Sequence, residues 1–157
     1  MQPSTDWFVA GVGDFGGYYN DDILWRNPNT GAVAVWVTDL LAPDVCMREP
    51  LRRVDPSWVI ASVGDFDGDG HADVLWRQPL TGANAIWPNA NPGAAERLAS
   101  ARPVWQVGDV LDLNGDSRAD IIWRNPTTGA NVVWYSGDGA TAVPLTGVTN
   151  PAWHIVP

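Results

Sequence analysis

The sequence is poor in cysteine, histidine and long apolar runs, and each shortage excludes a class of protein or site. Cys46 is the single cysteine, which excludes an intramolecular disulfide and a cysteine-based zinc site. No run of 18 apolar residues occurs, so no membrane span is predicted. Neither His71 nor His154 is placed as a base beside a nucleophile. We therefore expect a chain that is not an enzyme.

Positive charge is scarce as well. The chain has nine Lys and Arg residues in total and 18 Asp and Glu residues, which gives a formal net charge of −9. Nucleic acid is a poor partner for such a chain, because its phosphates need basic side chains to displace counterions. Seven of the 18 acidic residues fall in segments 65–73 and 112–120. Acidic residues clustered in this way indicate a site for a divalent cation, and not a charged surface that only keeps the protein in solution.

Tryptophan, glycine and proline are abundant, and the tryptophans follow one repeat. The chain has 10 Trp, 16 Gly and 13 Pro, a composition rich in turns and aromatics that predicts an all-β fold. The tryptophans form three equivalent sets, at 7, 58, 105 and 153, at 25, 76 and 123, and at 36, 87 and 134. A regular period of this size is typical of arrays and propellers. The sequence predicts a single repeat domain, 1–157, with repeats 7–57, 58–104 and 105–152, and 153–157 starting a fourth.

Each repeat predicts four strands. The first Trp opens a strand, an acidic segment follows, and a second strand ends in Trp-Arg. A turn with Pro near its start and Gly at its end leads into the third strand, as in 78–82. The fourth segments are irregular and vary in length, as outer edge strands do. Their prolines, Pro88, Pro92 and Pro144, fit an edge or a loop.

The acidic segment 65–73 carries the strongest chemical signal in the chain. Counted from its first residue, positions 1, 3, 5 and 9 are carboxylates, and His71 at position 7 can offer its backbone carbonyl; the carboxylates are Asp65, Asp67, Asp69 and Asp73. A Ca²⁺ ion takes six to eight oxygen ligands, and a loop that turns alternate residues inward supplies them. We predict a structural calcium site that ties the first strand to the second.

The two equivalent segments match this pattern to different degrees. Segment 112–120 keeps the oxygens but has Ser117 where the middle repeat has glycine; its predicted ligands are Asp112, Asn114, Asp116, Asp120 and the carbonyl of Arg118. Segment 14–22 keeps carboxylates only at positions 1 and 9, with Gly16 and Tyr18 at positions 3 and 5. The carboxylates at ligand positions thus number four, three and two, so calcium affinity should fall from 65–73 to 112–120 to 14–22.

A unit of Trp, then Gly-Asp-Phe-Asp-Gly-Asp-Gly-x-x-Asp, then Leu-Trp-Arg-x-Pro-x-Thr-Gly resembles the VCBS / FG-GAP repeat family, which is related to the propeller repeats of integrin α-subunits. The resemblance covers nearly the whole chain and is best in the second repeat. It implies one four-stranded propeller blade per repeat and Ca²⁺ in the acidic loop. It also implies an extracellular or surface protein, and some family members, including certain fungal lectins, bind glycans between blades.

The number of repeats leaves the architecture open. Propellers typically close with four to eight blades, so three blades would leave two apolar faces exposed to water. A homo-oligomer could cover them, as a dimer that forms a six-bladed ring, or neighbouring repeats of a longer array could do so. The alternative is a monomeric β-trefoil, which also has three repeats of four strands. The specific loop and Trp-Arg motifs favour blades.

Several aromatic and basic residues are candidate ligand contacts. The Trp-Arg pairs at Trp25 and Arg26, Trp76 and Arg77, and Trp123 and Arg124 could stack on a sugar and donate hydrogen bonds to it. The alternatives are core packing for the tryptophans and pairing with carboxylates for the arginines. Tyr18 and Tyr19 stand near the tip of the loop that is expected to lack metal.

Together these features predict a non-catalytic recognition module with carbohydrate as its first ligand. The alternative is a structural spacer or assembly domain of a larger secreted or surface protein. An extracellular or cell-surface location is expected. The first residues lack the basic and apolar regions of a signal peptide, so export would need another route or a segment outside this sequence.

Overall fold

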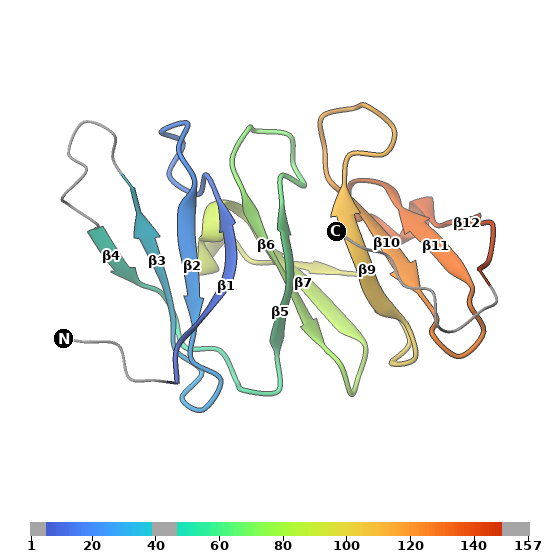
Figure 1. Cartoon of the computed structure of the whole chain (residues 1–157), viewed down its shortest axis with the longest axis horizontal. Helices are drawn as coiled ribbons and strands as arrows, with labels where there is room; N and C mark the ends of the chain where they lie inside the picture. The colour runs from blue at the N-terminus through green and yellow to red at the C-terminus, as the bar shows by residue number, and fades with distance from the viewer. Residues whose placement is uncertain (1–5, 39–46, 149–157) are drawn as a thin grey trace.

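The computed structural model describes residues 6–38 and 47–148, which form three separate four-stranded antiparallel sheets (Figure 1). Blade 1 consists of β1 (Phe8–Gly13), β2 (Asp22–Arg26), β3 (Val33–Val37) and β4 (Met47–Pro50). Blade 2 consists of β5 (Val59–Gly64), β6 (Asp73–Gln78), β7 (Ala83–Trp87) and β8 (Glu96–Leu98). Blade 3 consists of β9 (Gln106–Leu111), β10 (Asp120–Arg124), β11 (Asn131–Trp134) and β12 (Val143–Leu145).

The only helical elements among the described residues are four short 3-10 turns that lead into the outer strands of blades 2 and 3. They are η1 (Pro88–Ala90), η2 (Pro92–Ala94), η3 (Tyr135–Gly137) and η4 (Gly139–Thr141). Two of the three prolines expected outside central strands open such turns, and Pro144 lies in the edge strand β12. No helix within 6–38 and 47–148 is long and apolar enough to cross a membrane.

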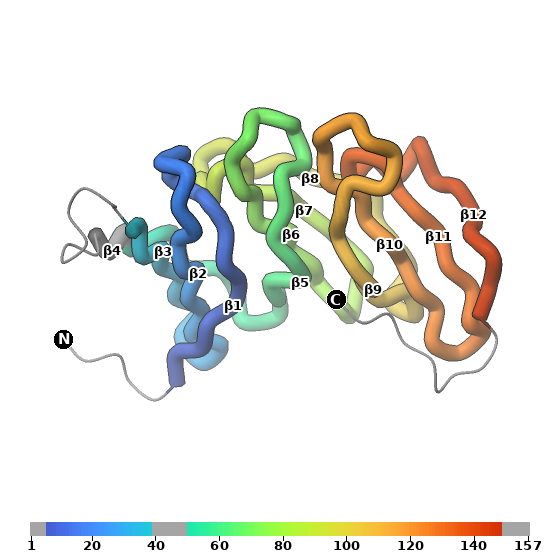
Figure 2. Tube along the Cα trace, turned by 45° about the horizontal axis from the view of Figure 1, so that its top comes forward, coloured from blue at the N-terminus to red at the C-terminus, as the bar shows by residue number. Residues whose placement is uncertain are grey.

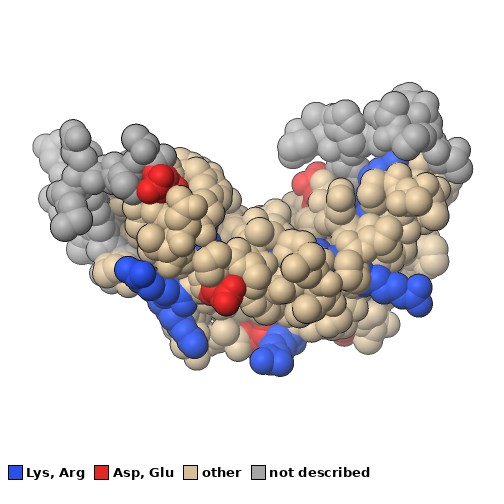
Figure 3. Space-filling model, turned by 90° about the horizontal axis from the view of Figure 1, so that it is seen from below, with Lys and Arg blue, Asp and Glu red and all other residues tan. Residues whose placement is uncertain are grey.

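The all-β, blade-type fold predicted from the sequence is confirmed, and the β-trefoil alternative is wrong. In each sheet the strands pair in chain order, and none of the described strands pairs with a strand of another sheet. The sheets stand side by side, with β1 beside β5 and β5 beside β9 along the inner row (Figure 2). Viewed from below, the molecule is an arc hollowed between its two outer blades, not a closed ring (Figure 3).

The core lies between the blades rather than inside one layer. One cluster joins blade 1 to blade 2 through Phe15, Leu24, Val74 and Trp76, and a second joins blade 2 to blade 3. The central strand of the middle blade shows the result, since Asp73 to Arg77 of β6 are all buried. In β2 of blade 1, burial alternates along the strand. A strand covered on both faces loses the period of two that a half-covered strand keeps.

Glycine allows the close approach of neighbouring blades. A Cβ on Gly64, the residue before the acidic loop of blade 2, would lie 2.8 Å from Val110 and 2.9 Å from Ala119 of blade 3. The equivalent Gly13 of blade 1 would place a Cβ 2.7 Å from Ala72 of blade 2. In blade 3 this position is Leu111, which is 39% exposed. A further blade therefore cannot pack on blade 3 as the blades of this chain pack on one another.

This leucine bears on how the arc is completed. A six-bladed ring built from two chains stays a prediction, and it requires a different packing at the outer face of blade 3. The start of a fourth repeat at 153–157 lies outside the described residues.

The predicted turns are confirmed, because Gly31, Gly82 and Gly129 have φ angles of 72°, 77° and 73° in the left-handed region.

Candidate metal centre

The three acidic segments form equivalent loops between the first and second strands of their blades. All three loops lie along the same edge of the row of blades, at the top of Figure 2. We call them loop 1 (14–22), loop 2 (65–73) and loop 3 (112–120). Positions 4 and 6 of every loop have left-handed backbone, whatever the residue there; these residues are Gly17, Tyr19, Gly68, Gly70, Gly115 and Ser117. The three loops thus follow one backbone path and differ in their side chains.

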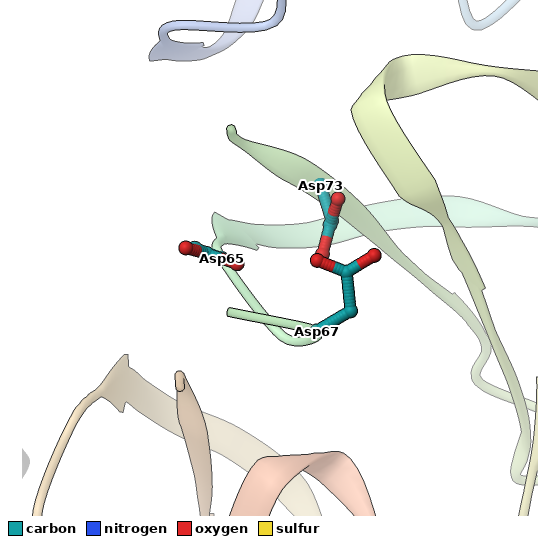
Figure 4. A group of neighbouring side chains, drawn as sticks. All are labelled: Asp65, Asp67 and Asp73. Carbon is teal, nitrogen blue, oxygen red and sulfur yellow. The ribbon is translucent and has the colours of Figure 1, made fainter. Parts of the chain in front are cut away.

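Loop 2 brings three of its four predicted carboxylates together. Asp65, Asp67 and Asp73 each offer an oxygen, and these oxygens all lie within 4.8 Å of one another. Figure 4 shows Asp67 and Asp73 turned toward each other with Asp65 beside them. Asp65 is held by the backbone N–H groups of Gly68 (2.7 Å) and Gly70 (2.8 Å), which curl the loop around its carboxylate. Such a set of oxygens fits a hard cation.

Asp73 gives this cluster its electrostatic character. It is completely buried at the start of β6, and burial is the main cause that raises its pKa to about 6. Hydrogen bonds from the backbone N–H groups of Asn89 and Phe66 oppose the rise, whereas the charges of Asp67 and Asp65 add to it. A carboxylate that is costly to ionise beside two others is stabilised by a cation.

Asp69, the fourth predicted carboxylate, lies outside the group of three. Its Oδ2 accepts a hydrogen bond from Nδ2 of Asn89 at 3.1 Å and lies 3.9 Å from Nδ1 of His71. Burial raises the pKa of Asp69, but the hydrogen bonds from the His71 N–H and the Asn89 amide outweigh burial and leave the pKa lowered. The carbonyl of His71 stays a predicted ligand. Its imidazole ring lies against Gly17 of loop 1.

Loop 3 has the same hydrogen-bonding frame with fewer charges. Asp112 accepts backbone N–H bonds from Gly115 (2.7 Å), Asp116 (3.2 Å) and Ser117 (2.9 Å). The side chain of Asn114 donates to Asp116 at 3.0 Å, and this bond is the main cause that lowers the pKa of Asp116.

The end of loop 3 also follows loop 2. The closing residue, Asp120, is fully buried and accepts N–H bonds from Leu113 and Ser136. The side chain of Arg118 lies over Gly68 of loop 2, while its carbonyl stays a predicted ligand. Loop 3 therefore keeps the frame of loop 2, and its metal binding stays a prediction.

In loop 1, backbone N–H groups surround both carboxylates. Asp14 accepts from Gly17 (2.6 Å), Tyr18 (3.1 Å) and Tyr19 (2.7 Å). Asp22 accepts from the N–H groups of Phe15, Gly16 and Thr38. No carboxylate stands at positions 3 and 5 of this loop, so peptide dipoles balance the charges that a cation would otherwise balance.

The predicted ligand contacts separate into exposed tyrosines and buried arginines. Tyr19 is 98% exposed and Tyr18 is 58% exposed at the tip of loop 1. Arg26, Arg77 and Arg124 are 2%, 5% and 8% exposed, so their guanidinium groups have little access to an outside ligand. A ligand role for the tyrosines stays a prediction.

The arginines join successive blades. The guanidinium of Arg77 lies 4.8 Å from the ring centroid of Trp123 and donates to the carbonyls of Ala101, Arg102 and Trp105. Arg26 lies 5.2 Å from the ring centroid of Trp76 and donates in the same way to the chain between blades 1 and 2. The hydrogen bonds of these two residues go to carbonyl oxygens, and Asp55 adds an electrostatic attraction to Arg26. Buried Trp76 and Trp123 are core residues, and Trp25 is half-buried.

Two functional features were missed by sequence reasoning. The first is a residue after the third strand of each blade, Thr38, Asn89 or Ser136, whose N–H binds the ninth residue of the loop. The sequence contains a pattern that could have identified these residues, since each lies two residues after the third Trp of its repeat and carries a side-chain oxygen. The second is a cavity of about 230 Å³ between blades 2 and 3, lined by Ser100, Ala101, Arg102, Trp105, Trp123, Val132 and Trp134.

Comparison with known proteins identifies the repeats that hold loops 2 and 3. The FG-GAP repeat model matches residues 57–87 and 104–143. No curated protein and no solved structure matches the chain. The first repeat, whose loop lacks carboxylates at positions 3 and 5, lies outside both matches. The family model confirms the resemblance in sequence, and it matches the second and third repeats of this chain, whose four-stranded sheets are propeller-like blades.

Proposed function

We propose that this chain is a calcium-stabilised, non-catalytic recognition module that acts outside the cell and binds carbohydrate. FG-GAP repeats are generally associated with divalent cations, and they occur mainly in extracellular or surface proteins. The observation that carries the calcium proposal is the cluster of Asp65, Asp67 and Asp73, with oxygens within 4.8 Å of one another around a buried carboxylate. Calcium would supply the charge that balances this cluster.

The chain's own residues define what the ion does. Asp65 follows β5 and Asp73 opens β6, so one ion held by both ties the first strand of blade 2 to the second. Asp67, Asp69 and the carbonyl of His71 complete the predicted set in loop 2. The role is structural, because a site filled by protein oxygens leaves no open position for a substrate.

Calorimetry and thermal unfolding of chelated protein test the calcium proposal. We expect calcium titration to show a tighter site in loop 2 and a weaker one in loop 3. At 100 times its Kd, an ion adds about 2.7 kcal/mol to stability. Asp67→Ala should abolish the tighter site and leave the weaker one. Absence of binding heat together with an unchanged Tm in calcium would refute the proposal.

The cavity between blades 2 and 3 is where we place the carbohydrate. Three tryptophans, Trp105, Trp123 and Trp134, form apolar walls, and exposed Ser100 and Arg102 stand at the rim. Its volume of about 230 Å³ is smaller than that of sites for drug-sized ligands, which are roughly 300–1,000 Å³. Apolar walls with a polar rim suit one sugar ring, whose C–H face packs on aromatics while its hydroxyls reach the edge.

The other blade junction supplies a matched control for this proposal. Arg77 binds the carbonyl of Ala101 at the cavity, whereas Arg26 binds the carbonyl of Val54 at the equivalent place between blades 1 and 2. Ala101→Val therefore inserts, into the cavity wall, a side chain that the same backbone setting accepts elsewhere in the chain. It should fill part of the cavity without disturbing the junction.

A glycan array followed by tryptophan fluorescence titration tests the carbohydrate proposal. Wild type should bind at least one monosaccharide family at millimolar affinity or better. Ala101→Val should weaken that binding at least tenfold, and Val54→Ala, far from the cavity, should leave it unchanged. Binding that survives Ala101→Val would place the ligand elsewhere, and an array without any signal would refute carbohydrate as the ligand.

The exposed position of Leu111 favours testing a second function, that of a spacer or assembly domain. Native mass spectrometry reports chain number and bound calcium in one spectrum. A dimer would support completion of the ring by a second copy, with blade 3 packed differently from the junctions inside the chain. A monomer would leave neighbouring repeats of a longer array as the partner.

A further inference from the structure

A residue from outside each acidic loop holds the carboxylate that closes the loop. The backbone N–H of Asn89 donates to Oδ1 of Asp73 at 2.8 Å, and that of Ser136 donates to Oδ1 of Asp120 at 2.8 Å. Both residues belong to the 3-10 turns η1 and η3, directly after the third strand of the blade. The third strand is thereby connected to the loop between the first two.

The side chains of these residues reach the fifth position of the same loop. Asn89 donates from Nδ2 to Oδ2 of Asp69 at 3.1 Å, and Ser136 donates from Oγ to Oδ2 of Asp116 at 3.5 Å. One residue thus holds both the fifth and the ninth carboxylate of its loop. The bridge is shorter in loop 2, where the donor is an amide, than in loop 3.

Blade 1 shows what happens where the fifth carboxylate is missing. Thr38 is the equivalent residue, and its N–H donates to Oδ1 of Asp22 at 2.8 Å. Position 5 of loop 1 is Tyr18, and the hydroxyl of Thr38 instead donates to the backbone carbonyl of Asp21 at 2.9 Å. The side-chain bridge therefore accompanies the carboxylate at position 5 and not the loop backbone.

The backbone conformation supports a role in the site. Asn89 has φ 52° and Ser136 has φ 50°, in the left-handed region that non-glycine residues rarely adopt. Such conformations cost of order 1–3 kcal/mol and persist where the surroundings fix them. In addition, Oδ1 of Asn89 is buried without a hydrogen-bond partner. Both observations indicate that the position of this amide is set by the loop and not by its own preferences.

We propose that Asn89 and Ser136 are positioning residues of the two calcium loops. Each ties the fifth carboxylate to the ninth, so that the fifth is kept beside the other loop carboxylates before a cation binds. The inference rests on the proposed calcium function. Loss of a group that orients metal ligands typically lowers metal affinity about 10–100-fold.

Asn89→Gly is the sharpest test, because glycine adopts the left-handed conformation freely and keeps the N–H that binds Asp73. We expect the calcium Kd of loop 2 to rise about tenfold in calorimetry. The Tm in chelator should not fall, because relief of the left-handed backbone offsets the lost hydrogen bond to Asp69. Ser136→Gly should raise the Kd of loop 3 by a smaller factor, since its bridge is longer. Thr38→Gly, the matched control in blade 1, should leave both calcium sites unchanged.

Three results would contradict these expectations, and they can be told apart. Wild-type calcium affinity in Asn89→Gly would overturn the positioning role while leaving calcium binding intact. A large fall in Tm in chelator with unchanged affinity would show that Asn89 only packs the blade, and would overturn it too. Wild-type protein that binds no calcium would refute the metal proposal itself. Ser136→Asn gives a second check, because it should tighten loop 3 toward loop 2.

Discussion

Loop 1 and loop 2 have the same backbone and balance their charge in different ways. Each has left-handed residues at positions 4 and 6 and aspartates at positions 1 and 9. In loop 1 the carboxylates of Asp14 and Asp22 each accept three backbone N–H groups. Loop 2 adds carboxylates at positions 3 and 5. The shared backbone therefore depends on its two end aspartates, and the two additional carboxylates create the demand for a cation.

The largest expected effect comes from replacing the ninth aspartate of each loop. Asp22→Asn removes the anionic acceptor of three N–H groups, and we expect a loss of about 2–3 kcal/mol with or without calcium. Asp73→Asn removes a calcium ligand but also relieves repulsion from Asp65 and Asp67. It should lose about 2.7 kcal/mol at a calcium concentration of 100 times the Kd, and less than about 1 kcal/mol in chelator.

Urea unfolding of both variants, each in calcium and in chelator, checks this contrast. The wild-type chain under the same conditions is the reference for all four measurements. If calcium changed the stability of Asp22→Asn and Asp73→Asn by the same amount, the proposed difference between the two loops would be wrong.

The pH dependence of the chelated protein should show the second effect. The folded pKa of Asp73 is about 6, above the ordinary value of 3.8, so the folded state binds more protons between these values. Stability without calcium should therefore rise by on the order of 1–2 kcal/mol as pH falls from about 6 to 4. Unfolding curves across this range measure it, and Asp73→Asn should remove the rise.

Calcium should remove this dependence, because protons and the ion compete for Asp73. In excess calcium, stability should stay nearly constant between pH 6 and 4, so the stabilisation that calcium adds over chelator should shrink as the pH falls through about 6. Asp22→Asn serves as the control and should keep both pH profiles. A chelated wild type that loses stability between pH 6 and 4 would contradict the raised pKa of Asp73.

Converting loop 1 into loop 2 is expected to have an intermediate effect. The backbone is already in place, so Gly16→Asp combined with Tyr18→Asp supplies the missing oxygens at positions 3 and 5. Both changes are needed, since a Cβ on Gly16 alone would lie 2.9 Å from the ring of Tyr18. We expect one additional calcium ion, weakly bound, in calorimetry. Gly16→Asp alone is the control, and unchanged stoichiometry in the double variant would contradict the prediction.

The sequence was sufficient to predict the blades, because tryptophan spacing and the acidic loop are local patterns repeated three times. It also predicted acidic loops between the first and second strands, of which loop 2 brings Asp65, Asp67 and Asp73 together and leaves Asp69 outside. The partners of Arg77 were not predictable, since its carbonyl acceptors lie more than 20 residues away, in a segment without a motif. The cavity was equally hidden. It depends on how the side chains of Trp105 and Trp134 are placed in space, which the sequence does not predict.

Substitutions at position 6 of the loops should change the stability least. Gly70 of loop 2 has φ 87° and no atom within 4 Å of an added Cβ, so Gly70→Ser tests the conformational cost alone. We expect a loss of about 1 kcal/mol in chelator. Ser117→Gly in loop 3 should return a similar amount, because Ser117 has φ 66°. Thermal unfolding measures both, and calorimetry should show calcium affinity moving in the same direction as stability. If Ser117→Gly destabilised loop 3, its side chain rather than its backbone would be what the loop requires at position 6.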